Sequence, residues 1–232
     1  MKTIGIIGGT GPESTIEYYK RIIAAYRERS ADASYPSMII NSINAAPLIE
    51  YVLARELDNV TELLVPEIDR LARAGADFGL IAANTPHVVF GAVSARSSIP
   101  LISIVEATAD AAVARGLERL ALFGTRLTME SDFYPKTFAR RNLDIVVPNE
   151  EERTFIHDVY MGELFHGVIR QQSRDALVAI ASKMKERDGI DGLILGGTEL
   201  SLILTEPTYA GLPVLDTTQI HVDAIVSAAL ED

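Results

Sequence analysis

Short apolar segments rich in β-branched residues alternate along the chain with longer segments in which apolar residues recur at helical spacing. This alternation is typical of parallel strands joined by crossover helices, and it predicts an α/β fold. The expected strands are 3–7, 37–41, 78–82, 101–103, 120–123, 144–147, 193–195 and 214–215, and the expected helices lie near 13–29, 57–74, 104–115, 173–187 and 217–230.

The pattern occurs twice. Short sequences recur in the same order and at nearly constant spacing: Gly9-Thr10 as Gly124-Thr125, Gly75-Ala76-Asp77 as Gly189-Ile190-Asp191, and Pro100-Leu101-Ile102 as Pro213-Val214-Leu215. This repetition predicts two similar domains, each a four-stranded parallel sheet flanked by helices and related by a pseudo-two-fold axis. The expected N-terminal half is 1–103, joined by the C-terminal helix 217–232, and the C-terminal half is 104–216.

The composition indicates which class of molecule the protein binds. The chain has 232 residues, of which 48% are hydrophobic, so it can bury a large core. Its formal net charge of -11 argues against nucleic acid or an anionic membrane, because both attract basic surfaces. The absence of cysteine excludes disulfides and thiolate chemistry. Without a targeting signal or an apolar span in the sequence, we expect a cytoplasmic protein that binds a small molecule.

The first strand leads into a glycine-rich turn, and the second copy of this turn carries Thr125. Open α/β sheets bind ligands at the carboxyl ends of their strands. We therefore expect Gly9, Thr10, Gly11 and Thr125 to bind a carboxylate or phosphate, although a tight turn with Thr10 or Ser14 as a helix cap is the alternative. The turn lacks the glycine spacing and the lysine of nucleotide-binding loops, so no nucleotide cofactor is expected.

Two further loops follow strands, and their sequences are Ala83-Asn84-Thr85-Pro86-His87 and Gly196-Gly197-Thr198-Glu199. Together with the opening Gly-Gly-Thr-Gly-Pro-Glu-Ser, they resemble the aspartate/glutamate racemase family over essentially the whole chain. That family typically has Cys-Asn-Thr-x-His in the first loop and Gly-Cys-Thr-Glu or Gly-Cys-Thr-His in the second. The resemblance implies a homodimer that racemises an amino acid without cofactor or metal. One thiolate removes the α-proton, and a second thiol returns a proton to the opposite face.

By this resemblance, the two cysteines fall on Ala83 and Gly197, and neither residue can hold a proton. Three interpretations stay open. Neighbouring groups replace the thiols, or the fold binds a carboxylate or does different chemistry, or one of the two positions has been altered. The candidate substitutes are Thr85, His87, Thr198 and Glu199.

Each candidate has a structural alternative. Asn84, Thr85 and Thr198 match substrate-binding positions of the family, but such residues also cap loops. His87 is a packed histidine in the simpler interpretation, and Glu199 equally suits the start of a helix, where its charge meets the helix dipole.

Three further features bear on the ligand. His166 matches a substrate-contacting position of the family. The loop 44–49 lacks the arginine of aspartate-selective members, so recognition of a distal carboxylate is in doubt. His157 and His221 are expected to be structural, and no residue spacing predicts a metal site.

The sequence therefore predicts a cofactor-independent amino-acid racemase or related isomerase, with a small carboxylate or amino acid bound between the two halves. The alternatives are a catalytically silent carboxylate-binding or sensor protein and a lyase or decarboxylase on the same scaffold.

Overall fold

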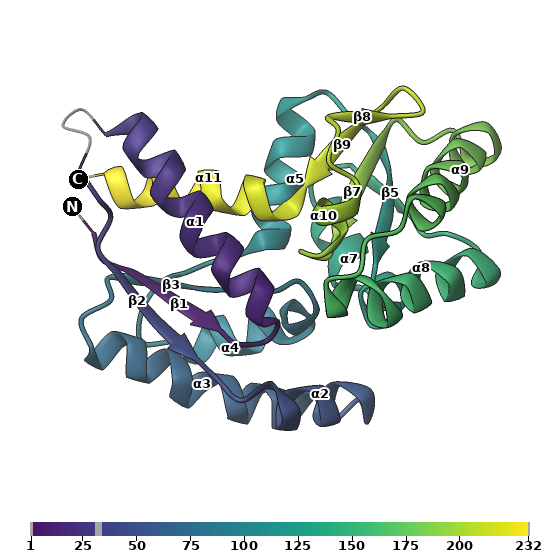
Figure 1. Ribbon diagram of the computed structural model, residues 1–232. Coiled ribbons are helices and arrows are strands. Elements are labelled where there is room, and N and C mark those ends of the chain that lie inside the picture. Colours follow the sequence, from purple (N-terminus) through teal and green to yellow (C-terminus); the bar gives the residue numbers. More distant parts are fainter. Residues whose placement is uncertain (1, 31–33, 232) are drawn as a thin grey trace. The chain divides into compact units, whose positions relative to one another are not determined.

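The computed structural model describes residues 2–30 and 34–231, which form two compact α/β units (Figure 1). The first unit combines Met1–Ile104 with His221–Asp232, and the second is Val105–Ile220. The sequence predicted an N-terminal half made of residues 1–103 and the helix 217–232. Its outermost residues, 1 and 232, lie outside the described residues.

The first unit contains a four-stranded parallel sheet with the order β2-β1-β3-β4. Its strands are β1 (Ile4–Gly8), β2 (Met38–Ser42), β3 (Phe78–Ile81) and β4 (Leu101–Ile102). Ile4 of β1 lies opposite Met38 of β2 on one side and Phe78 of β3 on the other. Because the strands are parallel, the loops that follow β1, β2 and β3 lie at the same end of the sheet, beyond the carboxyl ends of the strands.

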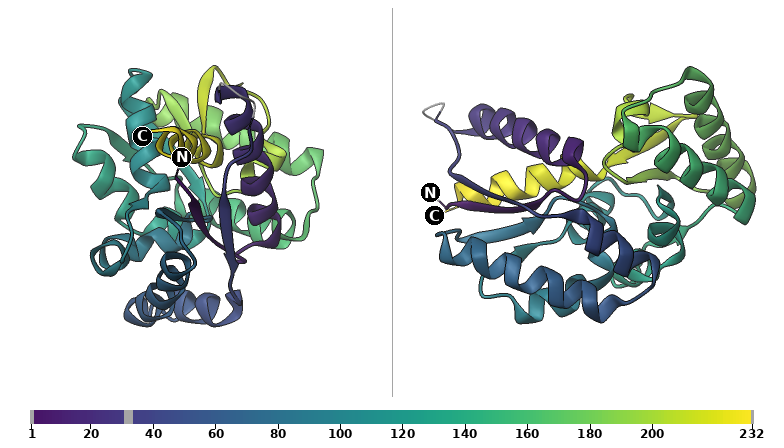
Figure 2. Two further views of the ribbon diagram at one scale, coloured as in Figure 1. Left: turned by 90° about the vertical axis from the view of Figure 1, so that its left-hand side faces the viewer. Right: turned by 60° about the horizontal axis from the view of Figure 1, so that its bottom comes forward.

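Helices cover both faces of this sheet (Figures 1 and 2). They are α1 (Pro12–Arg29), α2 (Ala45–Leu53), α3 (Leu57–Arg73), the 3-10 helix η1 (Thr85–Val89), α4 (Phe90–Arg96) and α11 (Thr217–Leu230). Ile6 of β1 packs with α1 and α11, whereas its neighbour Ile7 packs with α3 and α4. Successive side chains of a strand point to opposite faces, so a strand covered on both sides is apolar throughout, as the sequence of β1 is.

The second unit contains a five-stranded sheet with the order β6-β5-β7-β9-β8. Its strands are β5 (Arg119–Gly124), β6 (Asp144–Val146), β7 (Gly192–Gly196), β8 (Thr208–Tyr209) and β9 (Leu212–Asp216). Four strands are parallel as predicted, and β8 is an additional antiparallel edge strand. Ala210 and Gly211 join β8 to β9 with φ values of 51° and 68°. A two-residue turn with both φ values positive matches the twist of a hairpin.

The helices of the second unit are α5 (Ile104–Ala114), α6 (Arg126–Glu130), α7 (Phe133–Ala139), α8 (Glu150–Gly162), the 3-10 helix η2 (Leu164–His166), α9 (Gln171–Asp188) and α10 (Leu200–Ile203). Residues from α8, α9, α10, β5 and β7 share one buried apolar cluster. The start of α8 is set by a capping box, in which Asn149 and Glu152 bind each other's backbone N–H groups at 2.9 Å. This packing fixes α8, and with it Tyr160, against the strand that leads to Gly197.

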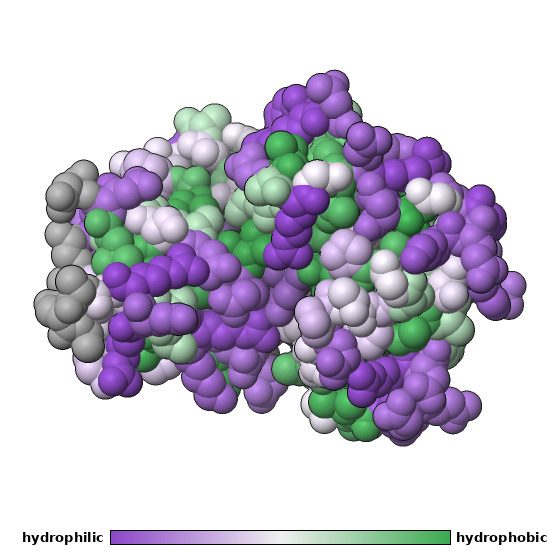
Figure 3. Space-filling model, turned by 90° about the horizontal axis from the view of Figure 1, so that it is seen from above, coloured by the Kyte–Doolittle hydropathy of each residue, from purple (hydrophilic) through white to green (hydrophobic). Residues whose placement is uncertain are grey.

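The predicted α/β class is confirmed, and each expected strand and helix is present within a few residues of its predicted ends. Hydrophilic residues cover much of the face that Figure 3 shows, with smaller hydrophobic areas among them. Among the described residues, no helix combines the length and apolar character that crossing a membrane requires.

Candidate functional site

The loop after β1 depends on a glycine in a left-handed conformation. Gly9 has a φ of 84°, and a Cβ atom at this position would lie 2.3 Å from the carbonyl oxygen of Ile43. The N–H of Gly9 donates to the Thr15 hydroxyl at 2.9 Å, and this hydroxyl donates onward to the carbonyl of Gly11 at 3.3 Å. The loop is therefore held from within, close to the backbone that follows β2.

The helix that follows this loop starts without a side-chain cap, because Gly11 occupies the cap position of α1. Neither predicted alternative cap acts there: Ser14 donates its hydroxyl to the carbonyl of Ala82 at 2.7 Å, and Thr10 has a buried hydroxyl oxygen without a partner among the described residues. Uncapped N–H groups at a helix start and an unpaired hydroxyl are suitable donors for an anion. Thr10 and Gly11 thus stay candidates for binding a carboxylate, whereas the N–H of Gly9 is taken by Thr15 and this predicted contact stays untested.

The loop after β3 holds His87 in a neutral, locked state. Its Nε2 accepts the N–H of Ile104 at 3.3 Å, so the proton is on Nδ1, which donates to the carbonyl of Ala83 at 2.8 Å. Burial lowers the pKa of His87 to about 4. Both ring nitrogens are used to fix the loop, so the geometry favours the structural interpretation of His87 over a role as a base. Asn84 is buried and Thr85 is half-buried in the same loop.

The corresponding loops of the second unit follow β5 and β7. Thr125 is the N-cap of α6, and its hydroxyl accepts the N–H of Thr128 at 3.3 Å. The same hydroxyl lies 3.0 Å from that of Thr128. The structure therefore gives Thr125 a capping role, on the loop where the sequence repeat predicted ligand binding.

Gly197 follows β7 directly and lies against the ring of Tyr160 from α8. A Cβ atom at position 197 would lie 2.3 Å from Cε2 of Tyr160 and 2.9 Å from its hydroxyl oxygen. The Glu199 carboxylate accepts hydrogen bonds from the Tyr160 hydroxyl and, at 2.7 Å, from the Thr198 hydroxyl. Tyr160, Thr198 and Glu199 are all buried. Glu199 does occupy the N-cap position of α10, as the alternative interpretation expected, but its side chain makes no cap hydrogen bond to that helix.

Tyr160 was not among the residues predicted to contribute to the site. It lies far from Glu199 in the sequence, and its position at the end of an amphipathic helix is typical of a core residue. Burial, and then the charge of Glu199, raise the pKa of Tyr160 well above its usual range. The hydroxyl is therefore protonated and acts as the donor in its hydrogen bond to Glu199.

His166 lies at the end of η2 and is exposed, with its ring packed edge-on against Phe165. His157 accepts the N–H of Arg126 at 3.1 Å, and His221 accepts the Tyr18 hydroxyl at 2.8 Å. His157 and His221 thus have the structural roles expected from the sequence. Across residues 2–30 and 34–231, no group of three or more histidine, aspartate or glutamate side chains is placed to hold a metal ion.

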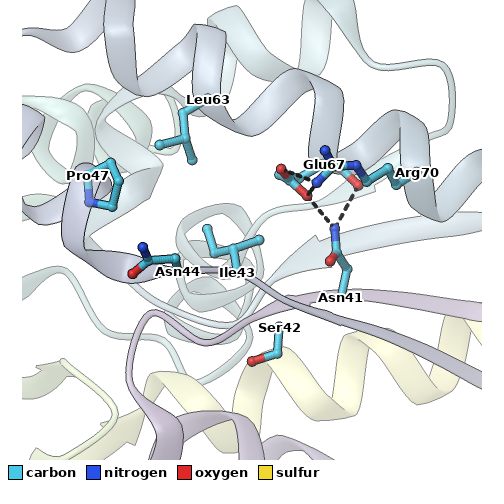
Figure 4. Close-up of a pocket in the computed structure, with 8 residues that line it drawn as sticks. All are labelled: Asn41, Ser42, Ile43, Asn44, Pro47, Leu63, Glu67 and Arg70. Carbon is cyan, nitrogen blue, oxygen red and sulfur yellow. Dashed lines mark hydrogen bonds and ion pairs between the residues drawn. The ribbon is translucent and has the colours of Figure 1, made fainter.

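A cavity of about 350 Å³ lies at the end of β2, between the following loop and α3 (Figure 4). Its lining includes Asn44 of the loop and Arg70 of α3, so an arginine does border this region although the loop itself has none. The Arg70 guanidinium is paired with Glu67, and the Glu67 carboxylate also accepts the amide of Asn41 at 2.7 Å. Glu67 offsets the charge of Arg70, so the cavity presents a paired rather than a free cation.

Loops that carry hydroxyl and backbone donors follow parallel strands in both units, which defines a duplicated α/β protein with candidate ligand-binding loops. A family model described as Asp/Glu/Hydantoin racemase matches residues 7–225. The chain belongs to this family, and the resemblance seen in the sequence motifs is confirmed.

Individual proteins that are similar to this chain are consistent with this family. An aspartate racemase homologue from Pyrococcus horikoshii is 38% identical, with a TM-score of 0.87 and 100% of each chain covered. The broad specificity amino-acid racemase RacX of Bacillus subtilis is 25% identical over 146 residues, which are 62% of this chain and 63% of that protein. An aspartate racemase from Picrophilus torridus shares the fold, with a TM-score of 0.75 at 21% identity, covering 99% of this chain and 94% of the other.

Proposed function

We propose that the protein is a cofactor-independent amino-acid racemase, or a related isomerase, that acts on a small carboxylate. Membership of the racemase family supports a racemase-type activity. The observation that carries the proposal further is the loop after β1, where the uncapped start of α1 and the Thr10 hydroxyl, which has no partner among the described residues, offer donors to a carboxylate. Asn84 in the loop after β3 is kept as a proposed substrate contact.

The reaction requires a group that takes the α-proton and a group that returns one. Ala83 and Gly197, which match the family's cysteine positions by resemblance, have no titratable side chain. The proton must therefore move through neighbouring groups, and the locked geometry of His87 argues against that residue. Thr85, Thr198 and Glu199 are the predicted substitutes that stay in this proposal, and His166 is retained as a substrate contact. By family resemblance, we also infer a homodimer that needs no cofactor, and we keep the cytoplasm as the proposed location.

Incubation with amino and hydroxy acids in deuterium oxide tests this function. We expect deuterium to replace the α-hydrogen of at least one acid, because abstraction and return of the α-proton exchange it with solvent. Proton nuclear magnetic resonance follows the loss of the α-proton signal. A family member that has both thiols is the control for conditions and acid panel. Absence of exchange with every acid, when the control exchanges its own substrate, would contradict the proposal.

A catalytically silent carboxylate-binding protein is the second candidate, and the absence of a titratable side chain at both Ala83 and Gly197 favours it. It predicts that a small carboxylate raises the melting temperature, since a ligand that binds only the folded state stabilises that state. The same carboxylate would show no α-exchange. Stabilisation together with exchange would exclude this candidate.

A further inference from the structure

The space next to Gly197 is filled by a tyrosine ring. The nearest atoms to a Cβ built at position 197 are Cε2, Cζ and the hydroxyl oxygen of Tyr160, at 2.3, 2.9 and 2.9 Å. Tyr160 is only 7% exposed and belongs to the main apolar cluster of the second unit, together with Leu195 and Leu200. A side chain at position 197 would therefore have to displace a packed aromatic ring.

The same geometry places an acid–base group where a side chain at position 197 would begin. The Tyr160 hydroxyl donates to the Glu199 carboxylate, which accepts the Thr198 hydroxyl as well. Glu199 is only 5% exposed, so its carboxylate depends on these hydroxyl donors for its hydrogen bonds. The three residues form a buried hydrogen-bonded group that links the tyrosine oxygen to the carboxylate.

We propose that the Tyr160–Glu199 pair replaces a thiol at position 197 as the acid–base group of the second unit. This inference rests on the proposed isomerase function. In the forward step, the α C–H bond of the substrate breaks and its electron pair stays on the substrate. The proton passes to the Tyr160 oxygen while the Tyr160 proton passes to the Glu199 carboxylate. The protons then held by Tyr160 and Glu199 exchange with solvent before the return step, in which Glu199 gives a proton to the Tyr160 oxygen, Tyr160 gives its proton to the same face of the α-carbon, and the carboxylate is restored. The pair thus exchanges the α-hydrogen with solvent on its own face, and inversion of the α-carbon needs a second group on the opposite face.

The electrostatics of the pair favour this coupled transfer. Burial and the nearby carboxylate raise the pKa of Tyr160, so a free phenolate next to Glu199 is strongly disfavoured. In the coupled transfer, the tyrosine oxygen gains one proton as it loses another and stays neutral. Only the protonation of Glu199 differs before and after the step, which limits the charge that the buried site has to carry.

The first test removes the hydroxyl and keeps the ring. Tyr160→Phe is expected to slow α-hydrogen exchange in deuterium oxide by about 100-fold or more, the usual contribution of a positioned acid or base. Glu199→Gln should slow it similarly. Tyr134→Phe is the matched control, because Tyr134 is another fully buried tyrosine of the second unit, packed between Phe133 and Phe138 of α7. It should exchange at the wild-type rate.

The outcomes separate the two proposals. Exchange by the wild type that persists unchanged in Tyr160→Phe would overturn the role of the pair and leave the isomerase function standing. A wild type that exchanges no acid would overturn both. A slower Tyr160→Phe protein whose melting temperature still rises on adding the carboxylate has lost proton transfer rather than binding.

A second test needs no turnover. Gly197→Cys is expected to lower the melting temperature by about 5 °C, because it overpacks the site against Tyr160. The same substitution in a Tyr160→Ala background should change the melting temperature little, since the ring that would collide with the new side chain is gone. Equal losses of melting temperature in both backgrounds would show that Tyr160 does not occupy the space of a side chain at position 197, and would overturn the inference.

Discussion

Between pH 7 and pH 5, the free energy of unfolding is expected to fall by about 4 kcal/mol, because two buried histidines stay neutral in the folded first unit. Burial lowers the pKa of His87 to about 4, and burial followed by the neighbouring His87 lowers the pKa of His221 to about 3. The two rings lie edge to face with centroids 6.3 Å apart. His221 accepts the Tyr18 hydroxyl and donates to the carbonyl of Ile102 at 3.0 Å.

The sign of this effect follows from which state binds protons. Unfolded histidines take up protons below pH about 6.5, whereas the folded histidines do not until the pH approaches 4 and 3. Falling pH therefore favours the unfolded chain across this window, and the full stability is present above it.

Denaturant unfolding at pH 7, 6 and 5 measures this dependence. His221→Gln should remove about half of the pH-dependent loss, because one of the two buried histidines that take up a proton on unfolding is gone. His166→Gln changes an exposed histidine and is the matched control. A stability difference between pH 7 and pH 5 that is the same in the wild type and in His221→Gln would contradict the assignment.

Gly9→Ala is expected to destabilise the first unit by about 3 kcal/mol or more, the upper end of the cost of a strained backbone conformation. The positive φ of Gly9 disfavours any side chain, and the new Cβ would also collide with the carbonyl oxygen of Ile43. That backbone cannot easily move away, because the N–H of Ile43 donates to the carbonyl of Gly8 at 3.0 Å. The variant should also weaken carboxylate binding, since the collision distorts the loop that follows β1.

Gly75→Ala is the control that separates the cost of the positive φ from the cost of the contact with Ile43. Gly75 has a φ of 99°, but a Cβ atom there meets nothing within 4 Å. Alanine at this position therefore lowers the stability only through the unfavourable backbone conformation. Chemical denaturation should therefore show a larger loss for Gly9→Ala than for Gly75→Ala. Equal losses would mean that the contact with Ile43 plays no part.

The helices that the sequence predicted are mostly those with a long periodic signal, such as α1 and α3, although the 13-residue α8 was not among the expected helices. The strands were predicted from short apolar runs rather than from a period, as in β1, which is apolar throughout. Helices of four to seven residues, such as α6 and α10, complete too few turns to show a period. Residues 44–49 were expected to be a loop, but α2 begins at Ala45, and Asn44 caps it by accepting the N–H of Ala46 at 3.1 Å.

The candidate site was predictable in position but not in side-chain contacts. The loops were located because ligand-binding turns follow parallel strands, and the repeat marked them twice. What each side chain contacts depends on segments distant in the sequence. The N–H of Ile104 binds the second ring nitrogen of His87, and the hydroxyl of Tyr160 from α8 binds the Glu199 carboxylate. No spacing within the loops encodes either contact, so the sequence offered a packed His87 only as one of two interpretations and gave no sign of the tyrosine–glutamate pair.

The measurement that tests the central claim most directly is chiral chromatography of a single enantiomer incubated with the protein. The substrate is the acid that exchanges its α-hydrogen. We predict that the opposite enantiomer accumulates toward equal amounts, and that a thiol-alkylating reagent leaves the rate unchanged, because the chain has no cysteine. The same reagent should inhibit a family member that has both thiols. A starting enantiomer that stays unchanged while the untreated control relative racemises its substrate completely would contradict the account.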